Sequence, residues 1–116
     1  MNINNLTIKA QEVLQSAMNL ARSDRNQAVE PLHMLDAIVA EDDSVGVFLL
    51  QKLGVNVGAL RSVLRQQVER LPKVEGGEVY FSRESSEAIQ KAGDFTKTFG
   101  DKYASVEHLL LGILTE

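Results

Sequence analysis

Cysteine is absent from the 116 residues, which excludes disulfide bonds and thiolate metal sites and is compatible with a reducing compartment. No apolar run approaches the roughly twenty residues that span a bilayer, and the first residues lack a basic segment followed by an apolar one. The 12 basic residues are scattered among 16 acidic ones, whereas nucleic acid binding draws on a concentrated basic surface. We therefore expect a soluble, cytoplasmic protein that binds neither membranes nor nucleic acid.

The chain is of ordinary globular composition, with 44% hydrophobic and 24% charged residues. Its length suits one domain with a single modest core.

A ten-residue stretch occurs twice, as EPLHMLDAIV at residues 30–39 and SVEHLLLGIL at residues 105–114. The two copies are 75 positions apart, because His33 corresponds to His108, and residues 7–41 align on residues 82–116 at this offset without a gap. Agreement at one fixed offset over two helical segments predicts a duplicated helical unit.

The apolar residues recur three and four positions apart, which predicts an all-α fold. Helix starts are indicated by side chains that can cap a first turn and by one proline: Thr7, Pro31, Ser44, Asn56, Ser82 and Ser105. We expect Ile8 and Phe99 on buried faces. Residues 45–50 are apolar on nearly every side, so we expect that helix to be buried on more than one side.

The predicted organisation is a first four-helix repeat at residues 1–71, a linker at residues 72–81 with Gly76 and Gly77, and the first half of a second repeat at residues 82–116. Residues 78–81 could form a short β segment, but the sequence offers no evident partner strand. By the logic of the repeat, the second unit is cut short. We expect such a fragment to expose apolar surface or to self-associate.

The sequence contains no G-x-x-x-x-G-K-[ST] motif, so we expect no ATP hydrolysis by this chain alone. Asp101 and Glu107 could act as an acid and base pair, and Thr7 could be oriented by them. A turn, a first helical turn and an N-cap explain the three residues better, and we expect no catalytic residue. His33 and His108 lack neighbouring ligands at helical spacing, so we expect no metal site.

The chain resembles the Clp N-terminal repeat family, and within it the ClpB-type AAA+ disaggregases. The resemblance lies in NLTIKAQEVLQSA (residues 5–17), VEPLHMLDAI (29–38), KLGVN (52–56), LPKVEGGEVYFSRE (71–84) and FGDKYASVEHLLLGIL (99–114). The duplicated helices fit any Clp N-terminal domain, including those of ClpA and ClpC. The LPKVEGGE segment selects the ClpB type.

This resemblance implies two pseudo-twofold-related four-helix repeats, attached to two ATPase modules of a homohexamer that binds ATP and Mg outside this fragment. It implies a stress-response chaperone whose N-terminal domain recruits unfolded or aggregated polypeptide, with the DnaK chaperone system as partner. The substrate-handling positions of the family, a threonine at the first helix and the acidic residues of GD-x₅-E, fall on Thr7, Asp101 and Glu107. Leu14 and Ile89 are equivalent in the two repeats and could belong to the core or to a groove wall.

Two other functions stay open at this stage. The chain could be an adaptor-docking domain of a ClpA- or ClpC-type protease ATPase, which the sequence downstream of residue 116 would decide. It could also be a small hydrolase that uses Asp101 and Glu107, which would require turnover by the isolated chain.

Overall fold

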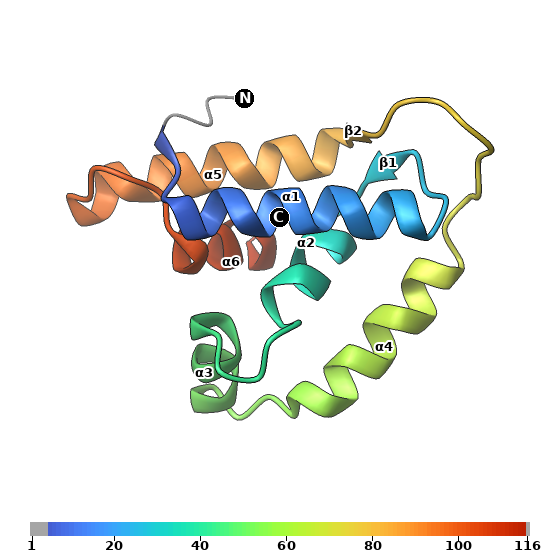
Figure 1. Ribbon diagram of the computed structural model, residues 1–116. Helices are drawn as coiled ribbons and strands as arrows, with labels where there is room; N and C mark the ends of the chain where they lie inside the picture. Colours follow the sequence, from blue (N-terminus) through green and yellow to red (C-terminus); the bar gives the residue numbers. More distant parts are fainter. Residues whose placement is uncertain (1–4, 116) are drawn as a thin grey trace.

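The computed structural model describes residues 5–115, which form six α-helices and two short strands (Figure 1). The elements in chain order are α1 (Ile8–Ser23), β1 (Ala28–Val29), α2 (Pro31–Ile38), α3 (Val45–Lys52), α4 (Val57–Glu69), β2 (Tyr80–Phe81), α5 (Arg83–Phe99) and α6 (Val106–Leu114). The prediction of an all-α fold is confirmed.

The helices begin where the sequence predicts. Four side-chain oxygens, those of Thr7, Ser44, Asn56 and Ser82, accept a hydrogen bond from the backbone N–H three residues later, at 3.0–3.1 Å. Helix α2 begins at Pro31, where a missing N–H costs nothing. Residue Gly100 ends α5 in the left-handed region, with φ of 74°.

The two repeats are related by a pseudo-twofold axis, which the hydrogen bonds between them reveal. Strand β1 pairs with β2 in parallel, so that Val29 lies opposite Phe81. Leu6 and Ala104, which form an isolated parallel bridge, are the residues 75 positions from Phe81 and Val29. Exchanging the two repeats therefore turns one contact into the other, as a twofold axis requires.

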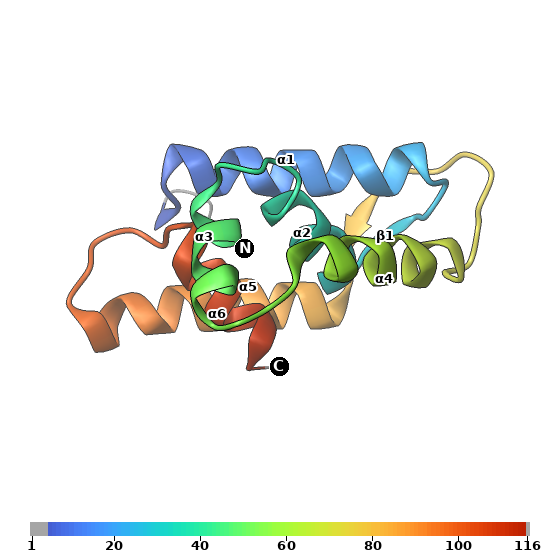
Figure 2. The same cartoon turned by 90° about the horizontal axis from the view of Figure 1, so that it is seen from below.

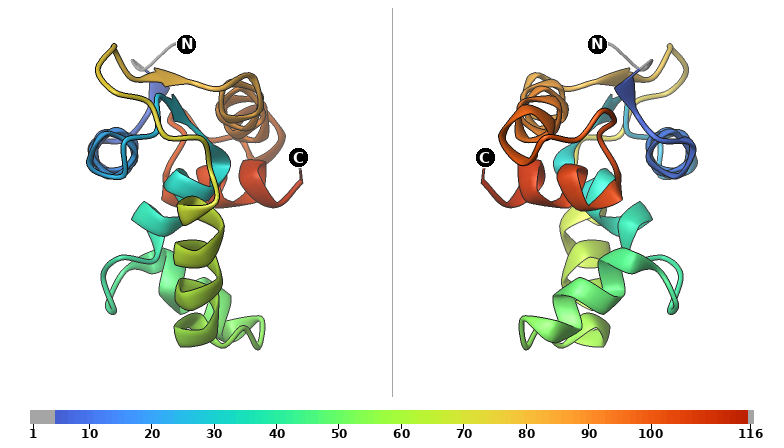
Figure 3. Two further views of the ribbon diagram at one scale, coloured as in Figure 1. Left: turned by 90° about the vertical axis from the view of Figure 1, so that its right-hand side faces the viewer. Right: turned by 90° about the vertical axis from the view of Figure 1, so that its left-hand side faces the viewer.

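The helices form two layers. Helices α1 and α5 run antiparallel along one side, and α2 and α6 lie between and beneath them (Figures 1 and 2). Helix α4 packs against α2, and α3 packs against α6 and α4, so α3 and α4 extend away from the α1–α5 layer (Figure 3). The start of α6 therefore meets the first repeat near the α2–α3 connection.

The core runs through both repeats, but three side-chain expectations were wrong. Phe99 is 60% exposed and Ile8 is 75% exposed, because each lies at the end of its helix, beyond the part that neighbouring helices cover. In α3, Val47 and Leu50 are buried while Val45 and Phe48 are exposed, because α6 and α4 cover only one side of that short helix in the described part of the chain.

The sequence offered no evident partner for the short segment at residues 78–81, but the structure gives it one, which is strand β1. Tyr80 N–H donates to the Gln27 carbonyl at 3.0 Å, and Ser82 N–H donates to the Val29 carbonyl at 3.0 Å. The partner was missed because two residues leave no alternating pattern in a sequence. The pairing brings the end of the predicted linker back onto the first repeat.

Candidate functional site

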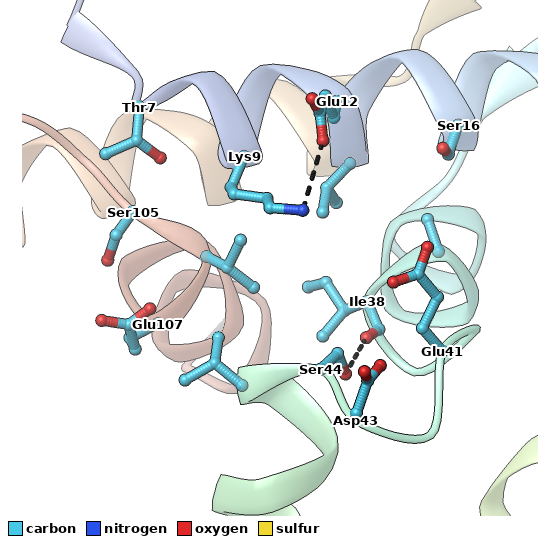
Figure 4. Close-up of a pocket in the computed structure, with 14 residues that line it drawn as sticks. Thr7, Lys9, Glu12, Ser16, Ile38, Glu41, Asp43, Ser44, Ser105 and Glu107 are labelled. Atoms are coloured by element: carbon cyan, nitrogen blue, oxygen red, sulfur yellow. Dashed lines mark hydrogen bonds and ion pairs between the residues drawn. The ribbon is translucent and has the colours of Figure 1, made fainter.

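A groove with a volume of about 550 Å³ opens where the first repeat meets the start of α6 (Figure 4). We call it the seam groove. Its lining comes from α1, from the end of α2 and the loop to α3, and from the first turn of α6. The volume falls within the range of ordinary ligand pockets.

The floor of the seam groove is aliphatic. In the described part of the chain, its apolar lining consists of Val13, Ala37, Ile38, Val45 and Val106. Ile38 and Val106 are buried, whereas Val45 is 42% exposed. Burial of such surface stabilises a bound apolar side chain by about 25 cal/mol per Å².

The second repeat carries Gly112 where the first repeat carries a residue with a side chain, and the difference falls beside the seam groove. An added Cβ at Gly112 would overlap the Ala88 carbonyl, so α5 and α6 approach more closely than a helix pair with side chains at both positions can. The equivalent positions in the first repeat carry Val13 and Ala37, and both line the seam groove. The first repeat therefore has larger side chains at both positions of the groove lining.

One wall of the groove is the loop between α2 and α3, and it is held from two sides. Ser44 Oγ donates to the Ile38 carbonyl at 3.0 Å and accepts from the Val47 N–H at 3.1 Å. The guanidinium of Arg61 donates twice to the Val39 carbonyl, at 2.8 and 2.6 Å, and pairs with Asp42 at 2.9 Å. The wall is therefore preformed, which lowers the ordering cost of binding.

The opposite wall is formed by Thr7 and by Ser105 and Glu107 at the start of α6 (Figure 4). Thr7 N–H donates to the Ala104 carbonyl at 2.9 Å, and its hydroxyl caps α1, so Thr7 is fixed at the contact between the repeats. Glu107 lies in the first turn of α6, where its charge meets the positive end of the helix dipole.

Asp101 lies outside the lining of the seam groove and contacts His108 near the start of α6. His108 Nδ1 accepts from the Ser105 N–H at 2.9 Å, so the neutral ring carries its proton on Nε2 and donates it to Asp101 Oδ2 at 3.0 Å. Asp101 thereby orients the histidine that holds the turn before Glu107.

The first repeat contains the same arrangement with an amide in place of the carboxylate. His33 Nδ1 accepts from the Glu30 N–H at 2.9 Å, and its Nε2 lies 3.0 Å from Asn26 Oδ1. Burial lowers the pKa of His33 below its ordinary value of 6.5, although Asp24, Glu30 and Asp36 act in the opposite direction. His33 is therefore a neutral, structural residue.

Of the sequence candidates, the structure brings Thr7 and Glu107 to one groove and leaves Asp101 beside it. Leu14 and Ile89 are 4% and 7% exposed and belong to the core, and neither is in the lining of the seam groove. Sequence reasoning missed Glu41 and Asp43, which the structure places in the lining of the seam groove.

The part of the chain that the structure describes offers no group of three or more His, Asp or Glu side chains arranged for a metal ion. Within residues 5–115 no single helix is long and apolar enough to cross a membrane. Helices α3 and α4 together reach the length and composition, but they are bent by 113° at their junction.

Proteins of similar sequence are chaperones. Chaperone protein ClpB of Bacteroides thetaiotaomicron is 49% identical over 115 residues, which are 99% of this chain and 13% of that protein. ClpB of Porphyromonas gingivalis is 45% identical over the same share of each chain. The chain thus spans about one eighth of the length of these relatives.

Solved structures of similar fold are also N-terminal domains. The Hsp104 N-terminal domain from Candida albicans has a TM-score of 0.85 and 21% identity, and the match covers 95% of this chain and 73% of that one. A ClpV N-domain in complex with a VipB peptide has a TM-score of 0.85 and 19% identity, covering 98% and 70%. The sequence model of the Clp repeat N-terminal domain matches residues 5–116. The chain therefore belongs to the Clp repeat N-terminal domain family, in the form that ClpB chaperones carry.

Proposed function

We propose that this chain is the substrate-recruiting domain of an ATP-dependent, ClpB-type disaggregase, and that the seam groove binds exposed apolar segments of unfolded or aggregated polypeptide. The observation that carries the proposal is the groove itself. It is preformed, aliphatic at its floor and open at the contact between the repeats. A solved relative in fold is described as a complex with a peptide, which supports a peptide as the ligand class.

The proposal extends to the whole protein of which this chain would be one domain. ATP and Mg are bound by modules outside this chain, in a cytoplasmic homohexamer that cooperates with the DnaK system in the stress response. The chain itself performs no catalysis. Thr7 and Glu107 contact the bound segment directly, whereas Asp101 contributes by holding His108 and the start of α6.

A valine pair provides the test. Val45 is 42% exposed in the groove, and Val63 is 50% exposed on α4 outside it. Binding of a fluorescent, permanently unfolded protein is measured by anisotropy for Val45→Gln and for the control Val63→Gln. Loss of aliphatic burial equivalent to one methylene group, at about 0.8 kcal/mol, weakens binding by about fourfold.

We expect this loss for Val45→Gln and unchanged affinity for Val63→Gln, with both variants folded by circular dichroism. Equal affinities of the two variants for the unfolded protein would reject the seam groove as the binding site. No binding of unfolded protein by the unmodified chain would reject substrate recruitment itself.

A second candidate function is docking of a dedicated adaptor, as in ClpA- and ClpC-type ATPases. The seam groove would also serve this function, because it binds through apolar contact. Recruitment of substrates predicts that many unrelated unfolded proteins compete for the groove, whereas docking predicts that one folded partner does.

A further inference from the structure

Carboxylates surround the mouth of the seam groove on three sides. Glu12 comes from α1, Glu41 and Asp43 come from the α2–α3 loop, and Glu107 comes from α6 (Figure 4). Among the described residues of the lining, Lys9 is the one basic side chain, so four negative charges face a single positive one and the net charge is −3.

Internal ion pairs do not neutralise this rim. Lys9 lies 3.7 Å from Glu12, and both side chains are largely exposed. In the acidic run at residues 41–43, Arg61 pairs with Asp42, which is not part of the lining. Among the described residues, no ion-pair partner faces the carboxylates of Glu41, Asp43 or Glu107. These charges are free to meet a ligand.

Helix dipoles oppose this negative charge but do not reverse it. Helices α1, α3 and α6 all begin at the groove, and each N-terminus carries about +0.5 of an elementary charge. Three such ends supply about +1.5 against the net −3 of the side chains. Thr7 and Ser44 already satisfy one N–H each at two of the three ends.

The floor and the rim therefore favour different chemical groups of one ligand. The aliphatic floor accepts small or branched apolar side chains, and a negative rim on three sides attracts cations next to them. An acidic segment would meet repulsion on those three sides of the groove.

We infer that the seam groove selects polypeptide segments in which aliphatic residues are flanked by lysine or arginine, and that it rejects segments with acidic flanks. This inference rests on the proposed function, since it names the class of segment that the same groove recruits. The rim thus gives a recruiting domain a preference by charge in addition to its preference for apolar residues.

Three labelled peptides test this preference on the full 116-residue chain. They share one aliphatic centre of valine, leucine and alanine and carry paired lysine, glutamine or glutamate flanks. With about 0.2–1 kcal/mol per exposed charge pair, two engaged pairs make the lysine peptide about fivefold tighter than the glutamine peptide. The advantage shrinks as salt rises from roughly 50 to 300 mM, because the Debye length falls.

Two double variants with the same change of charge assign the effect to the rim. Glu41→Gln with Asp43→Asn removes two groove carboxylates, whereas Glu69→Gln with Asp94→Asn removes two exposed carboxylates outside the groove. We expect the first pair to abolish the lysine advantage and the second to preserve it.

Several outcomes would overturn the inference. One is equal affinity of the three peptides, with competition by unfolded protein intact, which would leave the proposed function standing. Another is loss of the lysine advantage in both double variants, which would assign it to net charge. Failure of every peptide and of the unfolded protein to bind would reject both the preference and the proposed function.

Discussion

Substitution of two helical glycines by alanine separates tight helix packing from helix propensity. Gly112 in α6 contacts the backbone of α5 so closely that an added Cβ would overlap the Ala88 carbonyl. Gly93 lies inside α5 with no atom within 4 Å of the position of an added Cβ. The same chemical change therefore meets a neighbouring backbone at one site and open space at the other.

The expected magnitudes follow from two opposing terms. Replacing a helical glycine by alanine stabilises by about 0.8–1.0 kcal/mol, and this gain applies to both sites. Forcing a methyl group against a packed backbone costs about 1–3 kcal/mol, and this cost applies only at Gly112. Gly93→Ala should therefore gain nearly 1 kcal/mol, while Gly112→Ala should lose up to about 2 kcal/mol.

Urea denaturation followed by circular dichroism at fixed protein concentration measures both values. At about 2.1 cal/mol/K of unfolding entropy per residue, 1 kcal/mol corresponds to about 4 °C for a chain of this size, so the melting temperatures should differ by roughly 4–12 °C. Equal gains for the two variants would refute the close approach of α5 and α6 at Gly112.

Two further predictions concern the backbone and pH. Arg25, with φ of 58°, occupies the position equivalent to Gly100. Arg25→Gly should therefore stabilise the fold by roughly 0.5 kcal/mol, while Gly100→Ala should destabilise it by about 1 kcal/mol. Urea midpoints should shift in opposite directions for the two variants, and a loss of stability in both would contradict the prediction. Burial lowers the pKa of His33 below 6.5, so just below pH 6.5 the unfolded chain binds more protons than the folded one, and stability should fall as pH drops through this range. Urea midpoints at pH 7.5 and 5.5 measure the loss, and a His33→Gln variant with an unchanged pH dependence would assign it to other groups.

Local chemistry made most helix boundaries readable from the sequence. A capping oxygen or a proline acts on the turn that follows it, so the starts at Thr7, Pro31, Ser44, Asn56 and Ser82 needed no tertiary information. The duplication was readable as well, because helices that pack in the same way retain the same apolar pattern.

The errors arose where burial depends on a neighbour rather than on the residue. Ile8 and Phe99 continue the apolar pattern of their helices but extend past the helices that would cover them. The partner of residues 80–81 was missed because pairing over two residues is set by the placement of the repeats, not by strand propensity.

For the candidate site, the resemblance to the family pointed to Thr7 and Glu107, but it could not show that both line one groove. Asp101 was grouped with them by motif, and the structure shows it holding His108 instead of lining the groove. The acidic side chains of the α2–α3 loop became candidates only through their position across the groove.

The sequence by itself determined that this protein is a duplicated set of capped, amphipathic helices, because caps and periodic apolar faces are encoded within a few residues of the bonds they make. Only the tertiary structure decided where the seam groove lies and which charges surround it. Those properties depend on contacts between residues that are far apart along the chain, such as Thr7 with Ala104.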